Sequence, residues 1–332
     1  MSILIFDLDA TADAFGARLA QETGWEQGPF EWRRFEDGEF KLRPMMDVRR
    51  RQVVVVARTS GEIHNRLIAL GLMLSALRRQ EAAHVSVVLP CLPYARKDRA
   101  TQLRDPLSLQ WLAGILQASG MNALWTFESH QPAATENAFR VPVHGPSLVD
   151  WLQAQMNDAP ALAAHVEAMD AVASPDAGGV RRAQAVRGLI AARTGLQPAF
   201  ALLDKRRTAG KIEGDPSVVG EVAGLKVLVV DDLISSGATL ARAASALYRA
   251  GALQVHGLMA HGRPTSAVLD VLNAAGLRSL VLSDSQSGPV ESGRSEGAID
   301  RPTEAGVSGL SIKVVPLMPV LAAQMKMTLG AG

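Results

Sequence analysis

The sequence lacks most of the features that mark disulfide-rich, membrane-spanning or nucleic-acid-binding proteins. Its 332 residues contain one cysteine, Cys91, which excludes an intrachain disulfide and a cysteine metal cluster. No apolar run approaches the roughly 20 residues that span a bilayer, and no signal peptide is evident. The formal net charge of +1 gives no global attraction to nucleic acid or to a membrane surface. We therefore expect a cytoplasmic protein with neither of these partners.

The residues that are present favour a globular protein built from helices and parallel strands. Hydrophobic residues make up 48% of the chain and charged residues 20%, which supplies an ample core, and 332 residues suit two domains. Short apolar runs alternate with helical patterns, which predicts an α/β fold with mainly parallel sheets flanked by helices. The second half repeats this alternation, so we expect two similar domains with a boundary near Gly145–Pro146.

The most informative stretch is KVLVVDDLISSGATL, residues 226–240. Its uninterrupted apolar run predicts a buried parallel strand, with Asp231 and Asp232 at the carboxyl end. A small-residue loop then opens a helix, whose unpaired N–H groups suit a phosphate. The acid pair would repel that phosphate, so we expect it to bind sugar hydroxyls or Mg²⁺. The stretch favours a sugar-phosphate site, although any doubly wound protein can place acids before a capped helix.

Four further loops with charged residues follow predicted strands. They comprise residues 94–99, 128–131, 174–179 and 204–207. A solvated loop is the usual explanation for each charge run taken alone. Because ligands of open α/β sheets bind at the carboxyl ends of the strands, the shared position of the loops favours a joint polyphosphate site.

Single residues in these loops have both a functional and a structural interpretation. His130 directly follows a strand, and a lone histidine is more often structural than catalytic. Asp176 lies between a proline and two glycines, where it either holds a ligand or forms the turn at a helix start. The cations Lys205, Arg206 and Arg207 either neutralise a transferring phosphoryl group or form a solvated basic turn. The residues alone leave these alternatives open.

Six motifs, in the correct order, resemble those of the ribose-phosphate diphosphokinase family, which makes phosphoribosyl diphosphate (PRPP). They are FEDGE at 35–39, YARKDR at 94–99, SHQ at 129–131, SPDAGG at 174–179, DKRR at 204–207 and DDLISSGAT at 231–239. The first contains an Asp-Gly pair that predicts a β-hairpin turn. Lys97 stands where the family usually has Gln, and Glu128 and Ser129 replace the usual Asp-Leu. The resemblance covers nearly the whole chain.

The resemblance implies two phosphoribosyltransferase-type domains. Residues 1–145 would carry the ATP-site motifs, residues 146–309 the ribose-5-phosphate loop, and residues 310–332 a strand and helix that pack back on the N-terminal domain. The implied reaction transfers the diphosphoryl group of ATP to the C1 hydroxyl of ribose 5-phosphate and yields PRPP and AMP. It also implies Mg²⁺ as cofactor and a homo-oligomer, either a dimer or a hexamer.

The resemblance further implies a role for each motif residue. Lys205, Arg207 and His130 would be catalytic, and His130 and Asp176 would hold the metal. The residues that would bind ribose 5-phosphate are Asp231, Asp232, Ser235, Ser236, Gly237, Ala238 and Thr239. The residues that would bind ATP are Phe35, Asp37, Glu39, Arg96, Lys97 and Arg99.

Two other functions are compatible with parts of this pattern. A phosphoribosyltransferase that consumes PRPP would share the loop at 231–239, but it needs neither the ATP-like motifs nor the Lys205 loop. A non-catalytic regulatory homologue would fit the altered residues beside His130, but the retained catalytic residues argue against it. The stretch 283–309, rich in Ser, Gly and charge, is expected to form an exposed loop and to bear on regulation.

Overall fold

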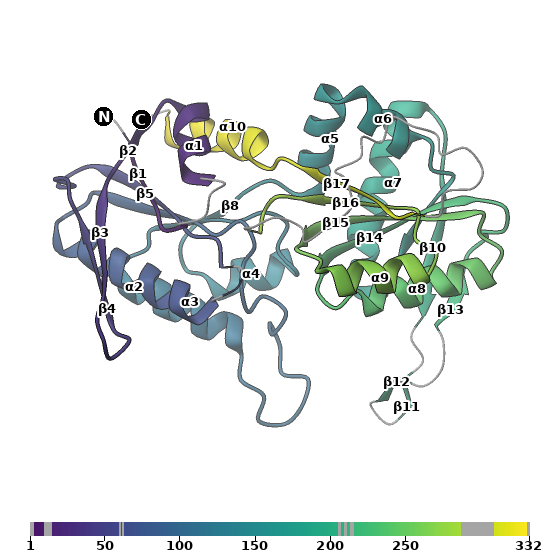
Figure 1. The fold of residues 1–332 in the computed structure, drawn as a ribbon, viewed down its shortest axis with the longest axis horizontal. Coiled ribbons are helices and arrows are strands. Elements are labelled where there is room, and N and C mark those ends of the chain that lie inside the picture. The colour runs from purple at the N-terminus through teal and green to yellow at the C-terminus, as the bar shows by residue number, and fades with distance from the viewer. Residues whose placement is uncertain are drawn as a thin grey trace. The chain divides into compact units, whose positions relative to one another are not determined.

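A computed structural model of the chain describes most of its residues (Figure 1). The described residues are 3–9, 15–59, 61, 63–204, 207–208, 211–212, 216–286 and 309–330, with the backbone alone at 207–208 and 211–212. The chain divides into two compact units, Met1–Ser147 with Ser285–Gly288 and Leu317–Gly332, and Leu148–Asp284 with Pro289–Pro316. In the described part, no helix combines the length and apolar character needed to cross a membrane.

The first unit is built on a parallel sheet with the strand order β2-β1-β5-β6-β7-β8. Alternate strand residues such as Val53, Val55, Val85 and Val87 pack against the apolar stripe of two helices, α2 and α3. Helices α1 and α10 lie on the other face of the sheet (Figure 1). The elements are β1 (Leu4–Asp7), α1 (Phe15–Thr23), β2 (Glu26–Gln27), β5 (Gln52–Val56), α2 (Ile63–Arg79), β6 (His84–Val88), α3 (Ser108–Ser119), β7 (Ala123–Trp125), α4 (Pro132–Ala138), β8 (Val143–His144) and α10 (Met318–Leu329).

A two-stranded hairpin, β3 (Phe30–Arg34) with β4 (Phe40–Pro44), separates β2 from β5. The Phe35 N–H donates to the Glu39 carbonyl at 2.7 Å, and Gly38 adopts φ +93°, a conformation that favours glycine. The predicted Asp-Gly turn is therefore confirmed.

The second unit repeats the architecture of the first. Its sheet has the order β13-β10-β9-β14-β15-β16-β17, and only the edge strand β13 is antiparallel. Helices α5, α6 and α7 lie on one face, and α8 and α9 lie on the other (Figure 1). The elements are α5 (Leu148–Asp158), α6 (Pro160–Glu167), β9 (Ala171–Ser174), η1 (Ala177–Gly179), α7 (Val180–Thr194), β10 (Ala199–Asp204), β11 (Arg207–Thr208), β12 (Lys211–Ile212), β13 (Ser217–Val219), β14 (Lys226–Ile234), α8 (Ala238–Arg249), β15 (Gln254–Gly262), α9 (Ser266–Ala274), β16 (Ser279–Ser283) and β17 (Ser311–Val315).

Each sheet has one point at which the strand order reverses. In the second unit the chain leaves β9 through α7 to reach β10, and it leaves β14 through α8 to reach β15 on the opposite side. In the first unit the reversal lies between β1 and β5, because the chain leaves β1 through α1 to reach β2 and leaves β5 through α2 to reach β6. Loops after such a pair of strands flank the crevice in which α/β proteins bind ligands.

A buried ion pair lies at the carboxyl ends of β1 and β5, where the first sheet reverses its order. Arg58, after β5, bonds to the Asp9 carboxylate through Nε and Nη2, and both side chains are fully buried. The Arg58 guanidinium also lies 4.9 Å from the ring centroid of Phe15, which is a cation–π contact. Arg66 Nη1 is 3.5 Å from Asp9 Oδ1 and donates to the Leu8 carbonyl at 2.6 Å. These contacts occupy the carboxyl ends of β1 and β5.

Several details differ from the sequence expectations. Strand β14 runs to Ile234, so the acid pair lies inside the strand instead of after it, because β15 is long enough to pair with residues 233 and 234. Helices α5 and α6 were not predicted. The strand and helix of 310–332 join different units: β17 extends the second sheet, whereas α10 contacts α1 in the first unit. Of the expected loop at 283–309, residues 287–308 lie outside the described residues, and Ser283 is buried in β16.

A chain of buried and half-buried polar side chains links α6 to the amino ends of β15 and β16. Ser279 Oγ lies 2.8 Å from His256 Nδ1 and 3.0 Å from His165 Nε2, and His256 Nε2 lies 3.3 Å from Gln254 Oε1. With both imidazoles neutral, each of these atom pairs has one donor and one acceptor. Burial, reinforced by the charges of His165, Lys226 and Arg278, lowers the pKa of His256 to about 3.

Acid is therefore expected to destabilise the second unit through His256. Below pH 6.5 the His256 imidazole binds a proton in the unfolded chain, but in the folded chain it stays neutral until the pH approaches its lowered pKa. The free energy of unfolding is therefore highest above pH 6.5 and decreases as the pH falls. The loss should approach about 1.4 kcal/mol per pH unit between about pH 6 and pH 4. Urea unfolding at several pH values measures it. His256→Asn should flatten this dependence and the exposed control His64→Asn should not; equal slopes in all three proteins would contradict the assignment.

Candidate functional site

The acid pair lies at the carboxyl end of β14, next to the point where the second sheet reverses its order. The side chains of Asp231 and Asp232 are only 18% and 10% exposed, and the Asp232 N–H donates to Asp231 Oδ1 at 2.9 Å. Burial raises the pKa of Asp231 to about 7, and the neighbouring Asp232 charge adds to the rise. Two confined carboxyl groups of this kind are suited to accept hydrogen bonds from vicinal hydroxyl groups.

The loop after β14 forms the start of α8. Gly237 precedes the helix with φ +74°, and Ser236 Oγ accepts a 3.4 Å hydrogen bond from the Ala238 N–H. A Cβ atom on Gly237 would lie 2.9 Å from Val268 Cγ1, so the tight approach of this loop to α9 requires glycine. Ser235 and Ser236 are exposed and Thr239 is half-buried. Backbone N–H groups and hydroxyls therefore meet at a helix N-terminus, which suits a phosphate.

The Asp176 loop approaches the acid pair from β9. Asp176 Oδ1 accepts from the N–H groups of Gly178 at 3.0 Å and Gly179 at 3.3 Å, so the side chain caps the short helix η1. A Cβ on Gly179 would lie 2.8 Å from Ser174 Oγ and 3.9 Å from Asp231 Oδ1. The turn-forming interpretation of Asp176 is thus confirmed, and a side chain at position 179 would contact Asp231.

Arg182 is the site residue that the sequence analysis missed. It lies in the first turn of α7, and its Nη1 is 3.6 Å from Asp231 Oδ1 and 4.0 Å from Asp232 Oδ1. Its charge opposes the rise in the Asp231 pKa. The sequence did contain a sign of this contact. A cation in the first turn of a helix interacts unfavourably with the helix dipole unless nearby acids compensate its charge.

The basic loop is only partly described. Strand β10 ends at Asp204, and its register places that end at the same sheet edge as β9 and β14. Lys205 lies outside the described residues. Arg207 belongs to β11, which pairs with β12, and its side chain is not described. Their catalytic roles stay predictions.

In the first unit, the predicted ATP residues lie in two exposed loops. Phe35 at the hairpin tip is 40% exposed, with the Arg33 guanidinium 5.2 Å from its ring centroid. Asp37 Oδ1 accepts from the Glu39 N–H at 3.0 Å, so this carboxylate also stabilises the turn. Arg96 in the second loop is exposed, as are Lys97 and Arg99.

Lys97, the departure from the family pattern, is held by its own loop. Its Nζ lies 3.3 Å from Asp105 Oδ2 and 3.4 Å from Thr101 Oγ1. Hydrogen bonds from the Thr101 side chain and from the backbone at 101 and 102, with Lys97 adding to them, lower the pKa of Asp105 to about 2. The extra positive charge is therefore matched by a nearby carboxylate.

His130 follows a strained segment of backbone. Glu128 adopts φ +33°, which is uncommon for a residue with a side chain, and its N–H donates to the Pro146 carbonyl at 3.1 Å. His130 itself is half-buried and precedes Gln131, the N-cap of α4. The strain coincides with the residues that depart from the family pattern. The position of His130 is compatible with both the catalytic and the structural interpretation given above.

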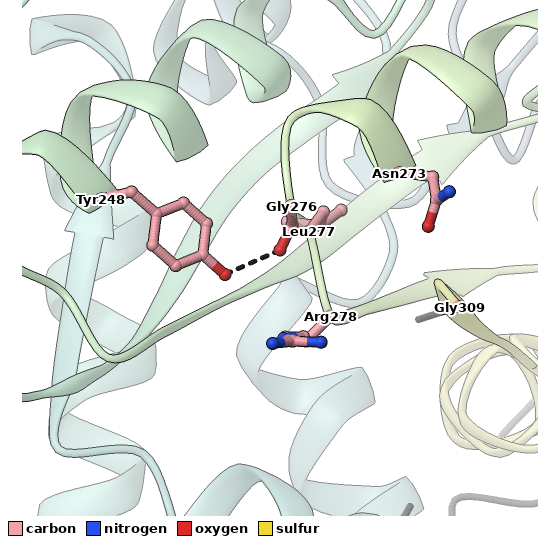
Figure 2. Close-up of a pocket in the computed structure, with 6 residues that line it drawn as sticks. All are labelled: Tyr248, Asn273, Gly276, Leu277, Arg278 and Gly309. Atoms are coloured by element: carbon pink, nitrogen blue, oxygen red, sulfur yellow. Dashed lines mark hydrogen bonds between the residues drawn. The ribbon is translucent and has the colours of Figure 1, made fainter. Parts of the chain in front are cut away.

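Two surface pockets lie away from these residues. Figure 2 shows one of about 190 Å³, lined by Tyr248, Asn273, Gly276, Leu277, Arg278 and Gly309, at the amino ends of β16 and β17. The Tyr248 hydroxyl there donates to the Gly276 carbonyl at 2.7 Å. The other, of about 570 Å³, lies along α3 and α4 and is lined by Gln110, Gly114, Gln117, Asn137, Ala138 and Arg140. Neither contains a predicted site residue.

The described residues contain no group of three or more His, Cys, Asp or Glu side chains that could hold a metal ion. The two predicted metal ligands can still fit Mg²⁺, because this ion usually keeps several waters and binds through one or two carboxylates plus substrate phosphates. Asp176 offers such a carboxylate oxygen. His130 offers nitrogen, a less typical magnesium ligand.

Both halves of the chain match known domain families. Residues 3–120 match the N-terminal domain of ribose phosphate pyrophosphokinase, and residues 153–293 match the phosphoribosyl transferase domain. The chain is 30% identical to ribose-phosphate pyrophosphokinase 1 of Streptococcus pneumoniae over 273 residues, 80% of each chain. It is 29% identical to ribose-phosphate pyrophosphokinase 1 of Lactococcus lactis over 296 residues, 87% of this chain and 86% of the relative.

A solved structure shows the same fold over the whole chain. The phosphoribosylpyrophosphate synthetase from Mycobacterium smegmatis superposes with a TM-score of 0.81 at 24% identity, and the match covers 100% of both chains. The predicted fold of two similar α/β domains is thereby confirmed.

Proposed function

Because the chain belongs to the ribose-phosphate pyrophosphokinase family, we propose that it transfers the diphosphoryl group of ATP to the C1 hydroxyl of ribose 5-phosphate. The observation that carries this proposal is the buried acid pair of β14, followed directly by the Gly237 turn and the N-terminus of α8. A carboxylate pair beside a phosphate cradle matches a phosphorylated sugar with free hydroxyls. The products are PRPP and AMP.

The second unit supplies the acceptor site in this proposal. Asp231 and Asp232 accept hydrogen bonds from the ribose hydroxyls, and the 5-phosphate docks on residues 235–239 at the start of α8. The buried setting of the acid pair strengthens its hydrogen bonds to the sugar, because fewer waters compete for the carboxylates.

The donor site uses the cations and the hairpin of the first unit. Arg96, Lys97 and Arg99 bind the ATP phosphates, and the hairpin residues Phe35, Asp37 and Glu39 bind the adenine moiety. An exposed aromatic ring and a fork of guanidinium donors suit these two parts of a nucleotide. The hairpin of a neighbouring copy completes this pocket in a homo-oligomer, a dimer or a hexamer, which sedimentation or light scattering would detect.

The chemistry is an in-line displacement at the β-phosphorus of ATP. The C1 oxygen forms a bond to that phosphorus, the hydroxyl loses its proton, and AMP departs with the bridging oxygen. Lys205 and Arg207 neutralise charge on the transferring oxygens, and His130 contributes to the same site. Mg²⁺ held through Asp176, His130 and the substrate phosphates would supply further neutralisation.

Release of AMP from ATP tests this function. With purified protein, Mg²⁺ and ATP, AMP should appear together with PRPP when ribose 5-phosphate is present, and only at background without it. AMP that is independent of the sugar, or its absence under both conditions, would overturn the proposal. The same assay distinguishes the alternatives, because a PRPP-consuming transferase needs no ATP and a regulatory homologue binds without turnover.

We also place the protein in the cytoplasm. Its single cysteine suits a reducing compartment, and cellular fractionation tests the assignment.

A further inference from the structure

A guanidinium group from α7 lies against the acid pair of β14. Arg182 Nη1 is 3.6 Å from Asp231 Oδ1 and 4.0 Å from Asp232 Oδ1. The Arg182 side chain is only 8% exposed, so this charge is withdrawn from water together with the two acids. One arginine therefore reaches both carboxylates that the proposed function assigns to the ribose.

The position of Arg182 is electrostatically costly without those acids. The first turn of α7 contains no acidic residue, and the helix dipole there is positive. Burial of a guanidinium adds a desolvation cost, which nearby carboxylates offset. The adjacent residue, Arg181, has an exposed side chain at the same end of the helix. Only the Arg182 side chain is directed to the acid pair.

The acid pair likewise depends on a nearby cation. Two neighbouring carboxylates that are 18% and 10% exposed repel each other strongly. Without a nearby cation, one of them would turn away or take up a proton. A protonated carboxyl group loses part of its capacity to accept hydrogen bonds from a sugar. A guanidinium within 4.0 Å of both acids offsets the repulsion and limits the directions that the two side chains can take.

We propose that Arg182 is a positioning residue of the ribose site, which holds the carboxylates of Asp231 and Asp232 in the arrangement that accepts the sugar hydroxyls. This inference rests on the proposed function, because it takes the acid pair as the ribose site. It assigns Arg182 no contact with the reacting atoms. A merely structural arginine would tie α7 to β14 without a specific effect on the sugar.

Direct binding separates the two roles. Affinity for ribose 5-phosphate is measured by titration calorimetry without ATP, and affinity for a non-hydrolysable ATP analogue is measured in parallel. Arg182→Gln should weaken ribose 5-phosphate binding about tenfold, a loss of about 1.4 kcal/mol, and leave the analogue's affinity unchanged. Arg182→Lys, which keeps the charge, should recover most of the loss. The matched control Arg181→Gln should bind both ligands like the unaltered protein.

Each result has a definite meaning. Selective loss of sugar affinity in Arg182→Gln, with rescue in Arg182→Lys and an unchanged affinity for the ATP analogue, supports the inference. Unchanged sugar affinity in Arg182→Gln overturns it, as does a loss of both affinities with a lower melting temperature in both variants. If the unaltered protein binds no ribose 5-phosphate, the proposed function fails and the inference fails with it.

Discussion

Replacing Lys205 with alanine should lower the rate of AMP formation by about a hundredfold to ten-thousandfold and leave ribose 5-phosphate affinity nearly unchanged. Cations aimed at transferring phosphoryl oxygens stabilise the transition state far more than the ground state, and losses of this size follow their removal. Turnover is measured in the AMP assay and affinity by calorimetry. The effect should therefore appear in kcat and hardly at all in the binding constant.

The choice of Lys205 rests on the strand that precedes it in the sequence. Strand β10 is parallel to β9, and β9 is parallel to β14, so β10 ends at Asp204 at the sheet edge that holds the acid pair. Lys226→Ala is a suitable control, because Lys226 starts β14 at the opposite edge. The control should turn over like the unaltered protein. Parallel losses of turnover and sugar affinity in Lys205→Ala would contradict the assigned role.

Replacing Gly237 with alanine should weaken ribose 5-phosphate binding by ten- to a hundredfold. Alanine at φ +74° costs about 1–2 kcal/mol, and its Cβ would lie 2.9 Å from Val268 Cγ1, so the loop or α9 must move. A shift of this turn displaces the N–H groups at the start of α8 from the 5-phosphate. Each hydrogen bond to a charged group that is lost costs about 1.5–3 kcal/mol.

Gly224 offers a matched control for the backbone strain. It also adopts φ +74°, but a Cβ there would meet no atom within 4 Å, and it lies on the loop that enters β14 at the opposite edge. The strain of alanine at this positive φ should destabilise both variants by a similar amount and lower their melting temperatures. Only Gly237→Ala should lose sugar affinity. Equal affinities in the two variants would show that the turn does not bind the phosphate.

Local patterns predicted most elements of the fold. Apolar runs of β-branched residues identified the central strands, because both faces of a parallel sheet are buried. The Asp-Gly pair identified the hairpin from turn geometry alone. Helices α5 and α6 were missed, and the end of β14 was misplaced because a strand's length depends on its partner: pairing with His261 and Gly262 carries β14 past its two acids.

The candidate site was predictable where one motif contains the whole arrangement. The acid pair, the Gly237 turn and the helix start are contiguous in the chain, and the structure describes them together. Arg182 was missed because the chain between it and Asp231 runs through the rest of α7, β10 and β13 before it reaches β14. Their contact depends on the pairing of β9 with β14, which brings the start of α7 to the acid pair. The residues around Arg182 give no indication of that pairing. The only local sign was a cation at the wrong end of a helix.

The buried pair of Arg58 and Asp9 bears on how a repeated architecture can evolve. Two domains of one topology have two equivalent points at which the strand order reverses. In the first domain, the fully buried side chains of Arg58 and Asp9 lie at the carboxyl ends of the two strands at that point. Removing one partner of a buried ion pair is strongly destabilising, so folding stability should limit substitution there. At the equivalent point of the second domain, ligand binding by the acid pair should set the limit instead.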